Sequence, residues 1–188
     1  IDYSRDYYER VVSYLIHEYK IGRTPNPDVM CNKEIKFGLF YQWAMTQGAD
    51  CIATGHYVRK HEARNSKFET IFAAKDSNKD QTYFLWTLTP EIIERCLFPI
   101  GEYTKPEVRA LARKYGLPVA DKKDSQGICF IGEGNMADFL REEITTRHGD
   151  IKTASGKKVG EHDGVELFTI GQRHGIGQAG GNGGPYYV

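Results

Sequence analysis

The sequence has no net charge and no long hydrophobic run. Each of these absences excludes a class of protein. Lysine and arginine together number 25, as do aspartate and glutamate, in a chain of 188 residues. The chain therefore lacks the overall basic character of many nucleic-acid-binding domains, and any contact with nucleic acid must come from a local patch. Apolar runs extend over only a few residues, so neither a signal peptide nor a membrane span is predicted.

Cysteine is also scarce. Four cysteines are far too few for a disulfide scaffold in a chain of this length, and no two of them form a C-x-x-C or zinc-knuckle pair. The histidines show no pattern with carboxylates or thiols that would suggest a metal. We therefore expect no tightly bound metal, and the reducing cytoplasm is the default location. The cysteines are Cys31, Cys51, Cys96 and Cys129.

Hydrophobic residues make up 40% of the chain and aromatic residues 12%, which is enough for a folded core. The length suits one domain, or one domain and part of a second. Helical stripes alternate with a short buried strand that ends in a glycine loop, a pattern typical of α/β proteins. The expected elements are helices over 5–19 and 32–48, a strand over 51–54, a hairpin pairing 57–63 with 68–74, and two short helices over 80–96.

A further helix has the clearest local signals. Thr104 is its expected N-cap, Glu107 completes a capping box and Gly116 ends it. Its predicted buried stripe includes Val108 and Tyr115. One more helix is expected over 135–147, followed by glycine-rich, strand-like sequence, so we expect a domain boundary near 131–135.

The stretch "PNPDVMCNKEIKFG" over 25–38 places a carboxylate, Asp28, three residues before a thiol, Cys31. Proline and asparagine are common at turns, and Asp28 or Asn32 could simply cap a helix while Cys31 packs as a small apolar side chain. The alternative is a reactive pair, which needs a chemical partner elsewhere in the chain.

Three other stretches can likewise be interpreted either as structural or as part of a reactive or binding site. Cys129 in "DSQGICFIG" is either a buried strand cysteine or a second reactive thiol beside a glycine that allows close approach. Lys79 and Gln81 in "KDQ" either belong to a turn or contact phosphate and a base edge. Gly55 in "ATGHY" follows a buried strand, where α/β sheets usually bind ligands.

Taken together, these blocks resemble the tRNA-specific 2-thiouridylases of the MnmA/TrmU type. The matching blocks occur in the order of that family and extend over 22–177. They are "GRTPNPDVMCNKEIKFG", "ATGHYVR", "KDSNKDQTYFL", "FPIGEYTKPEVRALA", "DSQGICFIG" and "LFTIGQRHGIG".

The resemblance implies the remainder of an ATP-pyrophosphatase-like (adenine nucleotide alpha hydrolase-like) Rossmann-type domain over 1–133. A small mixed central domain would follow over 134–188. The SGGxDS phosphate loop and the C-terminal β-barrel of the family are absent from this sequence, and both ends look cut from a longer chain. On this basis we expect residues 1–188 alone neither to hydrolyse ATP nor to thiolate tRNA.

The resemblance also implies the chemistry. Family members use ATP, expected with Mg²⁺, to adenylate the wobble uridine in the anticodon region of tRNA, and a sulfur-donor carrier protein supplies a persulfide. Cys129 would hold the persulfide, Cys31 would attack it and leave a Cys31–Cys129 disulfide, and Asp28 would act as the base. Gly55 would contact ATP. The tRNA-contacting positions would be Asn26, Pro27, Asp28, His56, Lys79, Asp80 and Gln81.

Other interpretations remain open at this stage. The same scaffold could serve an ATP-dependent amidotransferase or sulfurtransferase acting on a small molecule, a non-catalytic dithiol sulfur carrier, or a structural RNA-binding fragment. The resemblance favours a cytoplasmic protein, or a mitochondrial one if the source is organellar. Cys51 and Cys96 are expected to be structural. The densest basic cluster, which could contact further phosphates or form a solvated hairpin tip, comprises Arg59, Lys60, Arg64 and Lys67.

Overall fold

The structure is a computed structural model that describes residues 1–62, 69–122, 135–176 and 185–188. Its contacts divide the chain into two compact units. Unit 1 comprises residues 1–11 and 28–126, and unit 2 comprises residues 12–27 and 127–188. Of the candidate site residues, Asn26 and Pro27 belong to unit 2. All later candidates that the structure describes belong to unit 1.

The chain begins with a continuous helical run. It consists of α1 (Ser4–Tyr7), the π-helical segment η1 (Tyr8–Val12) and α2 (Ser13–Lys20). The helix predicted over 5–19 is therefore confirmed. Val11 and Leu15 in this run are fully buried, whereas Tyr8 is exposed.

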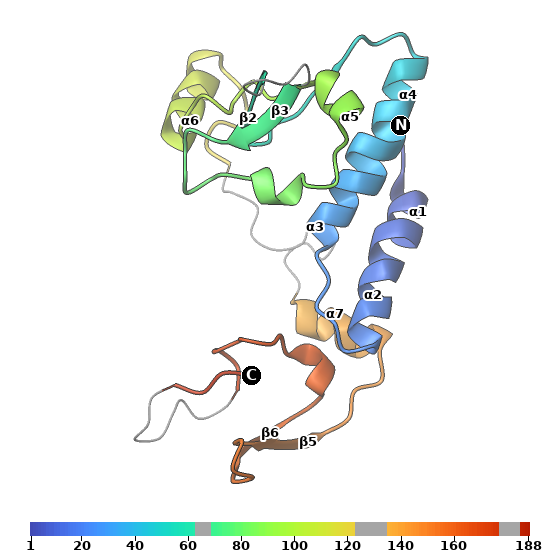
Figure 1. The fold of residues 1–188 in the computed structure, drawn as a ribbon, viewed down its shortest axis with the longest axis vertical. Helices are drawn as coiled ribbons and strands as arrows, with labels where there is room; N and C mark the ends of the chain where they lie inside the picture. The colour runs from blue at the N-terminus through green and yellow to red at the C-terminus, as the bar shows by residue number, and fades with distance from the viewer. Residues whose placement is uncertain (63–68, 123–134, 177–184) are drawn as a thin grey trace. The chain divides into compact units, whose positions relative to one another are not determined.

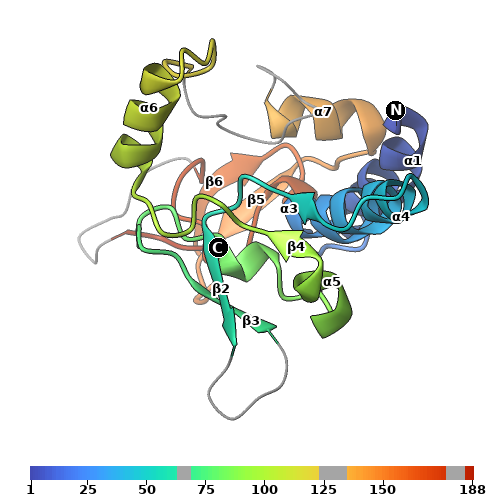
Figure 2. The ribbon, with the colours of Figure 1, turned by 90° about the horizontal axis from the view of Figure 1, so that it is seen from above.

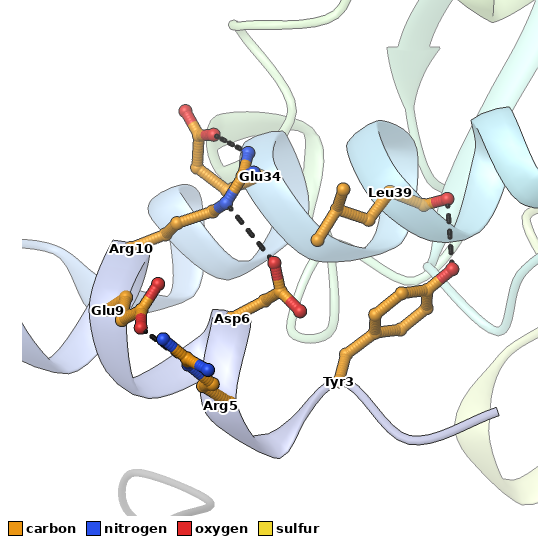
Figure 3. Close-up of polar contacts among 7 residues, drawn as sticks. All are labelled: Tyr3, Arg5, Asp6, Glu9, Arg10, Glu34 and Leu39. Atoms are coloured by element: carbon orange, nitrogen blue, oxygen red, sulfur yellow. Dashed lines mark hydrogen bonds and ion pairs between the residues drawn. The ribbon is translucent and has the colours of Figure 1, made fainter.

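Polar contacts join the start of this run to a second helix within unit 1 (Figure 3). The Tyr3 hydroxyl donates a hydrogen bond to the Leu39 carbonyl at 3.2 Å. The Arg10 guanidinium lies between two carboxylates, 3.8 Å from Asp6 and 3.4 Å from Glu34. These pairs are partly exposed, so each adds little stability, but together they fix how α1 packs beside the second helix.

The second helix begins a full turn earlier than predicted. It runs as one rod through α3 (Pro27–Met30), the π-helical segment η2 (Cys31–Phe40) and α4 (Tyr41–Thr46) (Figure 1). The prediction from residue 32 was wrong at this end because the prolines indicated a turn. Pro27 instead occupies the first helical position, where its missing N–H costs nothing and its fixed φ suits a helix.

A short parallel sheet lies at the centre of unit 1. β1 (Ile52–Ala53) pairs with β4 (Cys96–Leu97), with Ile52 opposite Cys96. The strand predicted over 51–54 is confirmed with shorter bounds, but β4 was not predicted. The core of the unit packs around this pair and consists of Phe37, Ala44, Ile52, Val58, Leu85 and Cys96.

The predicted hairpin is confirmed as β2 (Val58–Glu62) pairing antiparallel with β3 (Glu69–Ala73). Figure 2 shows its two strands side by side. The expected tip, Arg64–Asn65–Ser66, lies outside the described residues. The region predicted as two short helices contains the 3-10 turn η3 (Thr82–Phe84) and helix α5 (Pro90–Glu94).

Helix α6 (Lys105–Lys114) confirms the predicted capping box. The Glu107 carboxylate accepts a hydrogen bond from the Thr104 N–H at 2.6 Å and another from the Lys75 ammonium at 3.0 Å. These contacts lower the pKa of Glu107 to about 2, the Thr104 backbone bond contributing most. The predicted buried stripe was wrong, because no residue of α6 is buried and Tyr115 beyond its end is 69% exposed.

Unit 2 contains helix α7 (Met136–Glu143), the antiparallel strands β5 (Gly149–Lys152) and β6 (Lys158–His162), and the 3-10 turn η4 (Val165–Leu167). The Asn135 side chain caps α7 by accepting the Ala137 N–H at 2.9 Å. The helix and strands expected in this region are thus present. In the described part of the chain, no helix combines the length and apolar character that a membrane crossing requires.

Candidate active site

The candidate acid and thiol lie on the first turns of the second helix. Asp28 is exposed, whereas Cys31 is 8% exposed. Residues three apart on a helix share a face, so both belong to the same side of this rod. Of the residues before them, Asn26 is exposed and Pro27 is buried. Cys129 lies outside the described residues, so the structure does not test its predicted pairing with Cys31.

One turn further along, an asparagine and a lysine form a pair that the sequence analysis missed. Asn32 is only 2% exposed, and its amide donates to the Phe84 carbonyl at 3.2 Å. Its side-chain oxygen accepts a hydrogen bond from the Lys36 ammonium at 3.0 Å. The i, i+4 spacing of Asn32 and Lys36 was the available signal, but many exposed helix faces have the same spacing.

The segment that leaves β1 carries the next two candidates. Gly55 is exposed, and a Cβ placed there would meet no described atom within 4 Å. His56 is 8% exposed, and its ring centroid lies 5.7 Å from that of Phe37. Its Nδ1 lies 2.9 Å from the Thr54 hydroxyl. This segment therefore has an open glycine followed by a packed imidazole.

The surroundings of His56 keep its ring uncharged. Burial, and to a smaller extent the positive charge of Lys36, lower the pKa of His56 from 6.5 to about 4. At neutral pH the imidazole can therefore donate or accept a hydrogen bond, but it carries no charge with which to attract phosphate.

The "KDQ" triplet lies beside this same segment, and two of its three side chains fix the protein itself. One oxygen of Asp80 accepts the Ala74 N–H and the Thr82 hydroxyl, both at 2.7 Å. The Gln81 side-chain oxygen accepts the Tyr57 N–H at 3.0 Å, and the Gln81 N–H donates to the Tyr57 carbonyl at 3.0 Å. Asp80 and Gln81 thus connect the loop to the hairpin and to the residue after His56.

Three separate segments therefore meet at one edge of the parallel sheet. Contact between Phe37 and His56 joins the Cys31 helix to the exit of β1. Asn32 joins the same helix to η3, and Gln81 joins the loop before η3 to Tyr57. These contacts place His56 and Gln81 beside the segment that leaves β1 and pack the helix of Cys31 against it.

The basic cluster of the hairpin is not positioned to bind phosphate through Lys60. Its side chain is 13% exposed, and its ammonium pairs with Glu69 and donates to the carbonyls of Ile93 and Glu94 at 3.3 and 3.1 Å. Arg59 donates to the Ala73 carbonyl at 2.7 Å. Arg64 and Lys67 lie outside the described residues.

Two cysteines outside the site differ in exposure. Cys96 is completely buried, and burial raises the pKa of its thiol to about 11. Cys51 was expected in the buried strand, but it lies just before β1 and is exposed. The expectation failed because strand pairing begins only at Ile52.

The residues that the structure describes contain no group of three or more His, Cys, Asp and Glu side chains arranged to hold a metal ion. A cavity of about 550 Å³ lies in unit 2 between the β5–β6 hairpin and Tyr186–Val188. A second cavity of about 310 Å³ lies in unit 1 and is lined by residues that include Glu34, Phe37 and Thr87. None of the candidate residues predicted from sequence lines either cavity.

Comparison with known proteins supplies the family. The curated relatives include proteins named tRNA-specific 2-thiouridylase MnmA from Akkermansia muciniphila, Staphylococcus aureus and Legionella pneumophila. The first is 51% identical over 188 residues, which is all of this chain and 52% of the relative. The Staphylococcus protein is 50% identical over 188 residues, all of this chain and 50% of the relative. The Legionella protein is 50% identical over 180 residues, 96% of this chain and 49% of the relative.

The chain thus spans about half the length of the curated relatives that it matches. Two family models cover most of it. The model described as tRNA methyl transferase PRC-barrel domain matches residues 137–188. The other matches residues 1–133, and the chain belongs to the family that this model describes as tRNA methyl transferase HUP domain.

Proposed function

We propose that the protein carrying this chain catalyses the ATP-dependent 2-thiolation of the wobble uridine of tRNA. The observation that carries this proposal is the 51% identity, over the whole chain, to a relative named tRNA-specific 2-thiouridylase. The position of Gly55 and His56 supports it, because they follow β1 at the carboxyl end of a parallel strand, where α/β proteins bind nucleotides. A small-molecule sulfurtransferase is less favoured, because the names of the relatives specify tRNA.

In the proposed reaction, Asp28 takes the N3 proton of the uridine. The O2 atom of the uridine then attacks the α-phosphate of ATP, and pyrophosphate leaves. Mg²⁺ would accompany the ATP. The terminal sulfur of a Cys129 persulfide then attacks C2, and AMP leaves. The Cys31 thiolate attacks the Cys129 sulfur, which releases 2-thiouridine and forms a Cys31–Cys129 disulfide. A reductant must then restore both thiols, and a carrier protein must deliver the next sulfur.

The tRNA contacts in this proposal fall into two kinds. Asn26, Pro27 and Asp28 would meet the extruded base, since the reacting atom lies close to its pairing edge. His56, Lys79, Asp80 and Gln81 would contact the rest of the tRNA, and the bonds of Asp80 and Gln81 described above would hold their loop in place. Residues 1–133 would form part of the catalytic domain, and residues 134–188 would form a small central domain.

The test compares cysteine variants of the full-length protein that carries residues 1–188. We expect Cys31→Ser and Cys129→Ser each to abolish 2-thiouridine formation from tRNA, ATP and a persulfide donor, while Cys51→Ser, at an exposed position, stays active. Nucleoside mass spectrometry distinguishes replacement of oxygen by sulfur from addition of a methyl group, the reaction that the family description names. Undiminished thiolation by either variant, or a methylated product, would refute the proposal.

A further inference from the structure

Lys36 is an exposed residue at the candidate site, and the acceptor of its ammonium group is known. Its hydrogen-bond acceptor is the side-chain oxygen of Asn32, 3.0 Å away. Asn32 itself is almost fully buried and is anchored through its amide to the Phe84 carbonyl. The bond thus directs an exposed lysine side chain toward a buried amide that is itself anchored.

Among the residues that the structure describes, no carboxylate balances the charge of this ammonium. Within the described part of the chain, Lys36 has no carboxylate partner, in contrast to Lys75 with Glu107 and Lys158 with Asp150. The Asn32 oxygen is neutral. The nearby imidazole of His56 is neutral as well at physiological pH. An ammonium that has no carboxylate partner among the described residues is suited to bind an anion.

The location indicates which anion. The contact between Phe37 and His56 places the middle of the second helix beside the segment that leaves β1. Lys36 precedes Phe37 on this helix, and its charge acts on His56. Gly55 follows β1 at this end and leaves open space beside the backbone. In α/β proteins this is the edge at which nucleotide phosphates bind.

We propose that Lys36, held by Asn32 and Phe84 at the carboxyl end of β1, binds a phosphoryl group of the adenine nucleotide. The inference rests on the proposed function in so far as that function supplies the nucleotide. Lysine commonly binds phosphate as a compact point charge. In the proposed reaction, Lys36 would hold the phosphate that becomes the leaving AMP, while Cys31 lies on the preceding turn of the same helix.

Calorimetric binding of AMP and of adenosine to the full-length protein tests the inference. We expect Lys36→Gln to weaken AMP binding by about tenfold or more, because a charge-assisted hydrogen bond is lost. Adenosine has no phosphate, so its affinity should not change. Lys36→Arg keeps the charge and should retain most of the affinity for AMP. Lys33→Gln is the matched control, since Lys33 is exposed on the same helix and pairs with Glu34.

Two results would overturn the inference. One is wild-type affinity for AMP in Lys36→Gln, even if tRNA binding falls, because the lysine would then contact RNA rather than the nucleotide. The other is an equal loss for AMP and adenosine, which would indicate general damage to the fold. Gln can still donate to Asn32, and Lys36→Arg provides a second variant if stability falls.

The two proposals can fail separately. If wild-type protein makes no 2-thiouridine but binds AMP in a manner that depends on Lys36, the proposed function is wrong and the phosphate site stands. If wild-type protein thiolates tRNA while Lys36→Gln binds AMP normally, the function stands and the phosphate site is wrong. Absence of AMP binding by the wild-type protein would also overturn the site.

Discussion

The buried histidine beside Lys36 gives the sharpest quantitative prediction, namely that His56 stays uncharged until the solution is strongly acidic. Its ring is 8% exposed and packs 5.7 Å from Phe37, centroid to centroid. The pKa of His56 is lowered from 6.5 to about 4, mainly by burial and to a smaller extent by the charge of Lys36. Both favour the neutral ring, so protonating His56 must oppose folding.

The size and sign follow from linkage between protonation and folding. Between pH 6.5 and about 4, the unfolded chain binds a proton at His56 that the folded protein does not. The free energy of unfolding therefore falls as the pH drops through this window, and the contribution is fully retained above it. A shift of about 2.5 pKa units corresponds to roughly 3 kcal/mol, an order-of-magnitude figure for a buried ring.

The assay is an NMR titration of labelled histidine side chains, with His56→Gln to assign the resonance. We expect the His56 signal to titrate below pH 5 in the folded protein. Lys36→Met should raise this pKa, because it removes the nearby positive charge, but should not restore the ordinary value, because burial remains. A ring that titrates near 6.5 in the folded state would refute the reasoning about burial and charge.

Three further predictions concern groups whose partners the structure identifies. Gln81→Met should destabilise the protein by about 1–3 kcal/mol in urea unfolding, because the Tyr57 N–H loses its acceptor, whereas Gln81→Glu should largely preserve stability. Loss of tRNA binding with unchanged stability would instead indicate a direct contact. Iodoacetamide at pH 8 should alkylate exposed Cys51 and spare Cys96, whose pKa is raised to about 11 by burial. Equal labelling in peptide mass spectra would contradict this. Lys60→Met should lower stability by on the order of 1–3 kcal/mol while leaving the salt dependence of tRNA binding unchanged. A reduced salt slope would show that Lys60 does contact phosphate.

Local chemical signals made much of the fold predictable. The capping box of Thr104 and Glu107 located α6 because both bonds form within one turn of chain. The hairpin was predictable from two runs of strand-forming residues near each other in the sequence. Features that depend on distant partners were missed. β4 has only two residues and is a strand solely because it pairs with β1.

The same distinction explains the errors at helix boundaries and on helix faces. The two prolines predict a turn at Pro27, although proline suits the first position of a helix as well as it suits a turn. Apolar spacing predicted a buried stripe on α6 that ends at Tyr115. Spacing shows that residues share a face, but burial needs another element to cover that face, and in the described residues none buries this one.

Motifs in the sequence located the candidate site, but could not specify what each side chain in it does. Asp80 and Gln81 belong to a block that resembles a tRNA-contacting triplet, yet their polar atoms bond to Ala74, Thr82 and Tyr57. The residue types suit either role. The internal bonds depend on how β3 and the exit of β1 approach the loop, which the sequence does not show, and a contact of the same side chains with tRNA stays a prediction.

Two lysines of unit 1 illustrate the point most clearly, because one ammonium group is paired within the protein and the other has no carboxylate partner among the described residues. Lys60 lies in the densest basic cluster of the sequence, yet its charge is neutralised by Glu69 and by two carbonyls of the helix α5 region. Lys36 lies outside that cluster, and its ammonium donates to the neutral side chain of Asn32 near the uncharged His56. We therefore expect phosphate binding to depend more on whether a lysine already has a carboxylate partner than on the local density of basic residues. An isolated lysine held by a neutral buried amide is the better candidate for an anion contact.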